Sequence, residues 1–371
     1  MLVYETDDPD FADSAIDALT KAHIDSYRTG GRLTIPVSDP TICIHIRNDA
    51  DYRRASEIGD AIADTKATFK AKWGLWYNAN IRAKTALTRE RASELVTLAE
   101  RSGESDLLLE AYHCRWATAF FRGDIAPALD DARIGADSYD LTRHRHLGAA
   151  FGGHDPGVCA HAVIAMALVL QMSSDSELAK ESMARGLALA ERLDHPASVA
   201  HALSTWGYFH QFVADREATL EITRRLGALA EKFGLMPHRS QVLLLSAWAN
   251  ATGSGAAEAA RLIDAEIDKV TAVGTFPRYY LGLAGEVLLA AGLPADGLAQ
   301  LDRAIGTIDE PGVGFYLPEL YRLRGECLLA LSRRNKAKAR EAFVTARDVA
   351  RLQGATLFER RAETRLAEIA N

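Results

Sequence analysis

Residues 151–162 read Phe-Gly-Gly-His-Asp-Pro-Gly-Val-Cys-Ala-His-Ala, and they divide the chain into two unlike arms. Gly153 and the glycine before it can adopt backbone angles closed to other residues, which suits a sharp loop. Asp155 is suited to cap exposed helix amides, and Pro156 fits a first helical turn. We therefore predict a helix from Pro156, with His154 and Asp155 bonding nearby backbone groups and holding the loop against the following hairpin.

Helical spacing of apolar residues runs from Asp49 to the C-terminus. The spacing groups these segments into helical hairpins joined by short polar or glycine-containing turns. We expect the hairpins at 67–82 with 88–102, 106–122 with 124–138, 156–172 with 176–193, 196–213 with 215–233, 238–252 with 256–272, 277–291 with 294–308 and 316–331 with 335–353, before a last helix at 355–370.

A fixed period supports a true repeat, because small residues recur early in each second helix, where two paired helices approach most closely. The period is about 40 residues, apart from one longer step that contains the Gly-Gly-His-Asp-Pro-Gly loop. An insertion explains that step. The small positions are Ala128, Ala179, Ala218, Glu258 or Ala259, Gly297 and Ala339.

The first 48 residues differ in character from the rest. Residues 10–27 have helical spacing, which predicts one helix. Residues 33–37 and 41–46 are β-branched and bounded by prolines, so they favour short strands or extended segments. We therefore expect an all-α protein with two parts: residues 1–48, with room for one small β element, and residues 49–371, an α-solenoid of helical hairpins.

Composition limits the classes of function. The 371 residues carry 43 Lys and Arg against 50 Asp and Glu, and the net charge of −7 disfavours nucleic-acid binding. The longest apolar run, residues 162–170, is too short to span a membrane. The acidic first residues do not resemble a secretory signal, so we expect a cytoplasmic protein. Four scattered cysteines without a Cys-x-x-Cys pair indicate reduced, buried thiols.

The repeats resemble tetratricopeptide repeats, with partial matches at residues 123–128, 285–292 and 325–346. Five motifs in order resemble the C-terminal helical-repeat region of bacterial proteins that join a class III adenylate or guanylate cyclase to a STAND-type ATPase. They are Lys-Trp-Gly-Leu-Trp at 72–76, Leu-Leu-Leu-Glu-Ala-Tyr-His at 107–113, Gly-Gly-His-Asp-Pro-Gly-Val at 152–158, Asp-His-Pro-Ala-Ser-Val-Ala-His-Ala-Leu at 194–203 and Glu-Leu-Tyr-Arg-Leu-Arg-Gly-Glu at 319–326.

The resemblance covers about residues 50–370 and leaves out the catalytic parts of that family. The chain contains no Gly-x-x-x-x-Gly-Lys-Ser/Thr phosphate loop and no candidate pair of cyclase aspartates. We therefore expect a non-enzymatic protein that needs no cofactor. The Gly-Ser-Gly at 253–255 lacks the preceding strand of a nucleophile elbow and is interpreted as a turn.

Mapping the tetratricopeptide pattern makes Trp116, Ala167, Trp206, Gly285 and Gly325 equivalent, which implies the residues of the concave groove. A polar groove suits a protein segment better than an oily ligand. The implied groove residues are Glu110, His113, His161, Gln171, His210, Tyr279, Glu286, Arg322 and Glu326.

The leading hypothesis is a scaffold or sensor module of a bacterial signalling system that binds a protein segment or another copy of itself. The first alternative is a small-molecule sensor with the loop at 142–157 closing over the ligand. The second is one half of a split cyclase and ATPase gene.

A zinc site is the remaining chemical hypothesis, because imidazole and thiolate are preferred zinc ligands. The candidates are dense between residues 144 and 161 but match no known finger spacing, so we expect no metal and favour a loop-holding role for His154. The candidate ligands are His144, His146, His154, Cys159 and His161.

Overall fold

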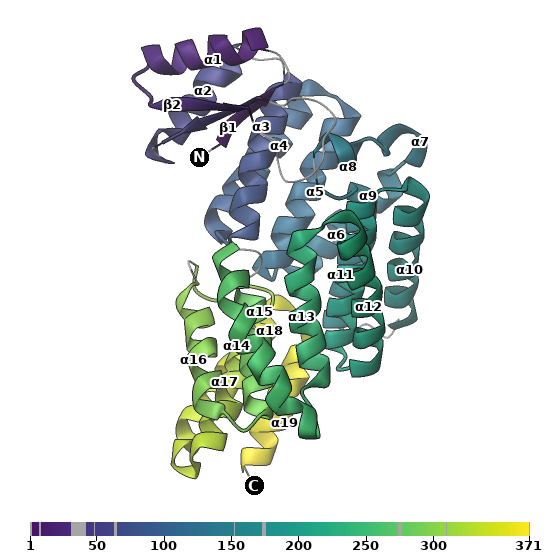
Figure 1. Cartoon of the computed structure of the whole chain (residues 1–371), viewed down its shortest axis with the longest axis vertical. Coiled ribbons are helices and arrows are strands. Elements are labelled where there is room, and N and C mark those ends of the chain that lie inside the picture. The colour runs from purple at the N-terminus through teal and green to yellow at the C-terminus, as the bar shows by residue number, and fades with distance from the viewer. Residues whose placement is uncertain are drawn as a thin grey trace.

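The computed structural model describes residues 2–6, 9–30, 42–47, 49–62, 65–151, 153–172, 176–273, 277–308 and 310–370. A small sheet with two helices lies at one end of the molecule, and stacked helices make up the rest (Figure 1). None of the helices in these ranges combines the length and apolar character needed to span a bilayer.

The N-terminal unit contains a three-stranded antiparallel sheet in the order β1-β3-β2. This sheet is the small β element expected in residues 1–48, and the strand expected at 41–46 is its central strand. The elements of the unit are β1 (Leu2–Thr6), α1 (Pro9–Lys21), β2 (Ser26–Gly30), β3 (Ile42–Ile46), a 3₁₀ turn (Asp49–Asp51) and α2 (Tyr52–Ile62).

The helix predicted over residues 10–27 is wrong at its C-terminal end. It stops at Lys21, because His23 has a positive φ of 59° and the Ile24 N–H turns back to the Leu19 carbonyl. The chain then reverses into β2, where Tyr27 pairs with His45. The strand expected at 33–37 lies outside the described residues.

The core of this unit joins the sheet to its helices and to the solenoid. Val3, Leu19 and Ile44 are buried together with Ala55 of α2. Ala71, on the first solenoid helix, completes the same cluster. Packing therefore places α2 with the sheet and seats the unit on the start of the helical stack.

The helical hairpins predicted from the sequence are confirmed, with boundaries that agree within a few residues. Each helix packs mainly against the next one along the chain, as in a tetratricopeptide-like α-solenoid. The pairs are α3 (Thr65–Ile81) with α4 (Thr85–Ser102), α5 (Ser105–Arg122) with α6 (Ile125–Ser138), α9 (Pro156–Leu170) with α10 (Ser176–Leu193), α11 (Pro196–Phe212) with α12 (Arg216–Phe233), α13 (Met236–Asn250) with α14 (Ala256–Val273), α15 (Pro277–Ala290) with α16 (Pro294–Gly306) and α17 (Leu317–Leu331) with α18 (Lys336–Gln353), followed by α19 (Thr356–Ala370).

Two short helices, α7 (Leu141–His144) and α8 (Leu147–Ala150), occupy the insertion that lengthens one repeat. Small residues fill most of the tight helix crossings, since Ala128, Ala179, Ala259 and Ala339 are buried, whereas Ala218 is half-buried and its neighbour Thr219 is buried in its place. A Cβ atom placed at Gly297 would lie 2.9 Å from the Gly285 carbonyl oxygen. The regular spacing of small residues therefore results from the close packing of the two helices in each hairpin.

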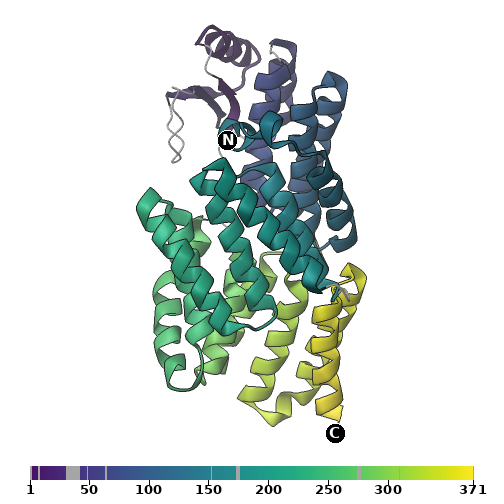
Figure 2. The same ribbon diagram turned by 90° about the vertical axis from the view of Figure 1, so that its right-hand side faces the viewer.

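The solenoid curves until distant hairpins touch, as a view from the side shows (Figure 2). The Gly314 N–H donates to the Arg122 carbonyl at 2.7 Å, and Arg122 also pairs with Glu310. The Phe120 and Phe315 rings stack with centroids 5.2 Å apart. These contacts bring the α16–α17 connection against the end of α5 and fill much of the inner curve with aromatic rings.

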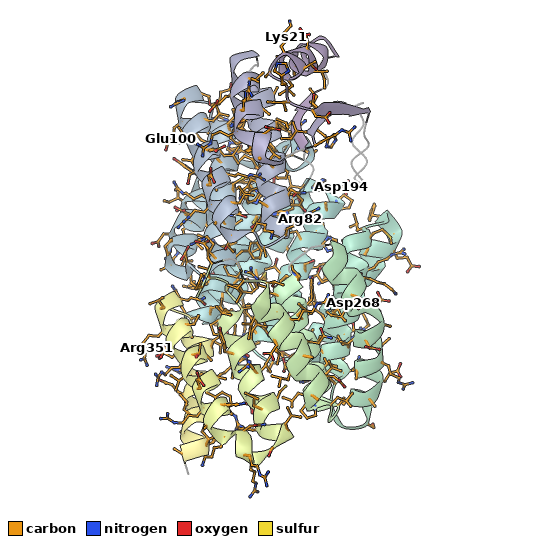
Figure 3. The ribbon with its side chains drawn as sticks, turned by 90° about the vertical axis from the view of Figure 1, so that its left-hand side faces the viewer. Lys21, Arg82, Glu100, Asp194, Asp268 and Arg351 are labelled. Atoms are coloured by element: carbon orange, nitrogen blue, oxygen red, sulfur yellow. The ribbon has the colours of Figure 1, made fainter. Side chains whose placement is uncertain are left out.

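Charged side chains cover the outside of the stack, including Glu100, Asp268 and Arg351 (Figure 3). Arg351 of α18 pairs with Glu359 of α19 at 2.7 Å. Surface pairs of this kind contribute little stability, so the last helix depends on its inner contacts.

Candidate functional site

Three of the predicted groove residues face the closed interior. Glu110, His113 and Tyr279 are only 1%, 2% and 3% exposed. The mapping placed them on the inner side of the curve, but neighbouring rings cover them there: Trp73 contacts Glu110, His154 contacts His113, and Tyr208 and Tyr316 contact Tyr279. These three residues therefore offer no open surface to a partner, which corrects the expectation of a continuous trough.

Three others lie apart from one another, with His161 near the start of α9, Gln171 at its end and His210 on α11. His161 Nδ1 lies 3.2 Å from the Ser182 hydroxyl. The His210 ring stacks on Trp206, with centroids 5.3 Å apart. Gln171 caps the end of α9 through its backbone N–H. Nothing in these contacts brings them into one site.

Glu286 and Arg322 do converge, at a hollow between helices α11, α13, α15, α17 and α19, and Glu326 bonds to two of its arginines, Arg322 and Arg365. The pocket has a volume of about 330 Å³. Sequence mapping missed the residues that α11, α13 and α19 contribute, because it had no information on which helices meet across the curve. The lining includes Gln211, Trp248, Glu286, Arg322, Arg361 and Arg365.

An ion network centred on Glu319 builds the wall of this pocket. Glu319 is 1% exposed and accepts two hydrogen bonds from Arg322, with Nη2 at 2.9 Å. Arg361 donates to the same carboxylate at 3.0 Å and also to the Phe212 carbonyl. Arg365 donates to Glu326 at 2.8 Å. The network ties α19 to α17 and α11.

The pKa values of Glu319 and Glu286 shift in opposite directions. Burial alone would raise the pKa of Glu319, but the charges and hydrogen bonds of Arg322 and Arg361 lower it below its usual range. Burial and the nearby charge of Glu319 raise the pKa of Glu286, although the charge of Arg322 opposes the shift. The groups around Glu286 therefore do not fully offset the cost of burying its negative charge.

The floor of the pocket is a fixed hydrogen-bonded chain. The Tyr279 hydroxyl donates to Gln211 Oε1 at 3.2 Å, and Gln211 Nε2 donates to the Tyr316 hydroxyl at 3.4 Å. Gln211 is 3% exposed. A second hollow, beside Arg278 and Phe315, has a volume of only about 40 Å³, room for little more than one water molecule.

The predicted cap before α9 is confirmed. The Asp155 carboxylate accepts from the Gly157 and Val158 N–H groups at 2.9 and 3.2 Å, and from the Tyr139 hydroxyl at 2.8 Å. Its backbone N–H donates to the Ser198 hydroxyl of α11 at 2.8 Å. Asp155 therefore holds the loop against the next hairpin as predicted, whereas His154 contributes ring contacts with His113 and His201 in place of the predicted bond to backbone groups.

The five candidate zinc ligands between residues 144 and 161 do not come together. His144 and His146 lie 3.7 and 3.5 Å from Asp106 instead. His154 and Cys159 remain together, and two histidines from other hairpins join them.

His113 of α5 and His201 of α11 complete this second cluster. The ligand atoms of His113, His154 and Cys159 lie within 4.8 Å of one another. The His154 and His201 rings stack with centroids 3.5 Å apart and planes 6° apart. Because the members come from α5, the loop, α9 and α11, no local spacing in the sequence reveals the cluster.

Glu110 orients the cluster from behind. Its Oε1 lies 2.9 Å from His113 Nδ1 and accepts from Trp73 Nε1 at 2.8 Å. Burial opposes a charged His113, but Glu110 and Cys159 raise its pKa to about 10. Burial likewise opposes a Cys159 thiolate, but the charge of His113 lowers its pKa well below the usual range.

A thiolate beside an imidazolium is the chemistry of a cysteine nucleophile. Cys159 is 3% exposed and His113 is 2% exposed. A substrate carbonyl could not reach the sulfur through this packing, so the cluster is not arranged for nucleophilic catalysis. The Gly-Ser-Gly segment is a 3₁₀ turn between α13 and α14 and likewise lacks the context of a nucleophile elbow.

Sequence comparison identifies a long relative. No family model matches the chain. An uncharacterized protein of Rhizobium meliloti (strain 1021) is 28% identical over 323 residues, which are 86% of this chain and 31% of that protein. The chain therefore spans about a third of the length of that relative.

Structural comparison identifies helical-repeat proteins. A tetratricopeptide repeat protein from Parabacteroides merdae ATCC 43184 matches with 12% identity and a TM-score of 0.41, over 80% of this chain and 98% of that one. A Rap protein complexed with competence and sporulation factor matches with 12% identity and a TM-score of 0.44, over 86% of this chain and 81% of that one. Because both scores are low, the α-solenoid assignment rests on the helix contacts of this chain.

Proposed function

We propose that the chain is a non-enzymatic interaction module that binds a polar protein segment in the pocket between α11, α13, α15, α17 and α19. The supporting observation is the pocket itself, about 330 Å³ of space lined by Glu286, Arg322 and Arg365 on the inner side of the curve. Inner surfaces of solenoids commonly serve as binding surfaces.

The pocket offers both kinds of hydrogen-bonding group. Glu286 can accept from a ligand amine, guanidinium or backbone N–H, and the incoming donor would compensate its buried carboxylate. Arg365 and Arg322 offer guanidinium donors to a carboxylate or carbonyl, and Trp248 provides a flat apolar wall. A short peptide segment carries this mixture of donors, acceptors and apolar groups.

The experiment selects peptides from a displayed library on the purified full chain and measures their affinity for variants. Thr364→Trp fills the pocket from α19, where Thr364 lines it. Thr97→Trp on α4 is the matched control, because both hydroxyls donate to the carbonyl four residues earlier and both residues are exposed. The Thr364 variant should lose at least about tenfold in affinity, or 1.4 kcal/mol. Equal affinity for both variants would refute the proposed site.

A small-molecule sensor is the second candidate, because the pocket volume falls within the range of small-molecule sites, about 300–1,000 Å³. The loop at 142–157 contacts the start of α11 through Ser198, whereas the pocket uses Gln211 and Ala214 at the other end of that helix. The small-molecule hypothesis for this pocket therefore does not include the loop at 142–157 closing over the ligand. A thermal-shift screen of metabolites, repeated on Thr364→Trp, distinguishes it from peptide binding.

The wider setting follows from the sequence resemblance and is part of the same proposal. We place the module in a cytoplasmic bacterial signalling system that uses cyclase or ATPase domains, encoded with it or split from it. Neighbouring open reading frames test the split-gene version. Light scattering on the purified chain tests self-association.

A further inference from the structure

We propose that His113, His154, Cys159 and His201 form a buried four-ligand site for a zinc-type divalent transition-metal ion. This inference is independent of the pocket, which lies at the far end of α11. It also replaces the expectation of no metal, which was based on sequence spacing alone.

Unsatisfied nitrogen atoms provide the first evidence. The Nε2 atoms of His113, His154 and His201 are all buried, and none has a hydrogen-bond partner among the described residues. Buried polar atoms are nearly always paired in native proteins, so three such atoms around one thiol need an explanation. A metal ion would bond to all three.

The arrangement of the possible metal-binding atoms provides the second line of evidence. Nδ1 of His113 is occupied by Glu110, so Nε2 is the atom left for a metal. In a tetrahedral zinc site, bonds of about 2.0–2.3 Å put neighbouring donors about 3.3–3.6 Å apart. The donors of His113, His154 and Cys159 lie within 4.8 Å of one another, so small side-chain rotations would bring them to an ion.

His201 supplies the fourth donor. Its ring lies flat against the ring of His154, with centroids 3.5 Å apart. The ligand atom of His154 lies within 4.8 Å of the Cys159 sulfur, so the His201 ring stands directly next to the cluster. A rotation of the His201 side chain would turn its unpaired Nε2 toward the ion.

Rigid mounts hold all four ligands. His113 lies in the middle of α5, and Cys159 lies in the first turn of α9. His154 immediately precedes Asp155, which is fixed by its cap bonds and by Ser198. Behind His113, the Glu110 carboxylate bonds to the His113 ring and is itself held by Trp73, which is the carboxylate–histidine arrangement that orients metal-bound imidazoles.

Charge and softness favour zinc over magnesium or calcium. A divalent ion, a Cys159 thiolate and the Glu110 carboxylate sum to zero, which is what a buried site requires. Imidazole and thiolate are ligands for zinc-type ions, whereas magnesium and calcium take oxygen. Four protein ligands leave no open position, so the ion would be structural and would join α5, α9 and α11.

The test uses the full chain purified from zinc-supplemented cells, with metal content measured by mass spectrometry. We expect about one zinc ion per chain, and we expect cobalt added after chelation to give a thiolate charge-transfer band and tetrahedral d–d bands. Cys159→Ser and His154→Gln should lose the thiolate band or bind at least about tenfold more weakly. Cys327→Ser and His161→Gln are the controls, a second buried cysteine and a histidine of α9 bonded to Ser182, and they should bind as the wild type does.

A second readout on the wild-type chain remains decisive if the variants fail to fold. A chelator should lower its melting temperature, and zinc should restore it, because an ion bound only to the folded state stabilises it. The proposal is overturned if the wild-type chain contains less than about a tenth of an ion and cobalt produces no thiolate band. It is equally overturned if folded Cys159→Ser binds cobalt with the wild-type spectrum.

Discussion

Replacing Arg361 by Met should loosen the last helix from the solenoid. Arg361 donates to Glu319 at 3.0 Å and to the Phe212 carbonyl, so it joins α19 to α17 and α11. The aliphatic part of Met preserves most of the packing, and the change removes the charge and both hydrogen bonds. Arg360→Met is the matched control, because its side chain is exposed one position earlier.

The expected magnitude follows from burial. Removing one partner of a buried ion pair costs about 3–5 kcal/mol when the other charge is left alone. Glu319 keeps its hydrogen bonds to Arg322, and the Arg361 side chain is 27% exposed, so both factors reduce the loss. We expect about 2 kcal/mol, close to the loss of two charge-assisted hydrogen bonds after this discount.

Hydrogen exchange measured by mass spectrometry gives the local answer, which suits a solenoid that can open from its end. A loss of about 2 kcal/mol corresponds to roughly 30-fold faster exchange. We expect that acceleration in peptides from residues 356–370 and little change in α3 to α5. Exchange within about threefold of the Arg360→Met control would refute a locking role for Arg361.

Three further predictions concern stability. The pKa of Glu319 is lower in the folded state than in the unfolded chain, so its contribution to stability is present above about pH 4.3 and is lost as the pH falls through the folded-state pKa. The difference in unfolding free energy between wild type and Glu319→Gln, measured by urea titration, should therefore become smaller in acid. Gly135→Ala should cost about 1–3 kcal/mol in urea unfolding, because the new Cβ would lie 2.3 Å from the Trp116 ring. Asp155→Ala should cost about 2–3 kcal/mol, because it removes a helix cap and a partner of the Tyr139 hydroxyl, and a cost below 0.5 kcal/mol would contradict the role given to this cap.

The hairpins could be predicted from the sequence because their signals are local. Helical spacing, glycine at helix ends and proline at helix starts act within a few residues. Gly103 and Gly234 end their helices with positive φ values, and Pro196 and Pro277 begin theirs. The confirmed boundaries depend on no long-range contact.

The N-terminal sheet and the closed interior could not be predicted in the same way. Pairing β1 with β3 joins residues 2–6 to residues 42–46, and no local pattern fixes that register. Closure of the curve depends on Phe120 meeting Phe315, far along the chain. Small rotations between successive hairpins decide that meeting, so the mapping could assign the inner face but not show that part of it is covered.

Each of the two candidate sites also combines residues set by a local pattern with residues that only long-range packing brings in. Glu286 and Arg322 follow the same local repeat pattern on α15 and α17, and both line one pocket. Arg361 and His201 complete their sites from other hairpins, and only the packed structure associates them with their partners.

Photo-crosslinking is the most direct measurement of the proposed binding pocket. A compact diazirine amino acid, much smaller than the tryptophan that fills the pocket, replaces Thr364 in the pocket or Thr97 on the outer surface, and each chain is irradiated with a selected peptide bound. We predict a crosslinked adduct from position 364, absent from position 97 and abolished by excess unlabelled peptide. Equal crosslinking from both positions, or none from position 364 while the peptide remains bound, would contradict binding in this pocket.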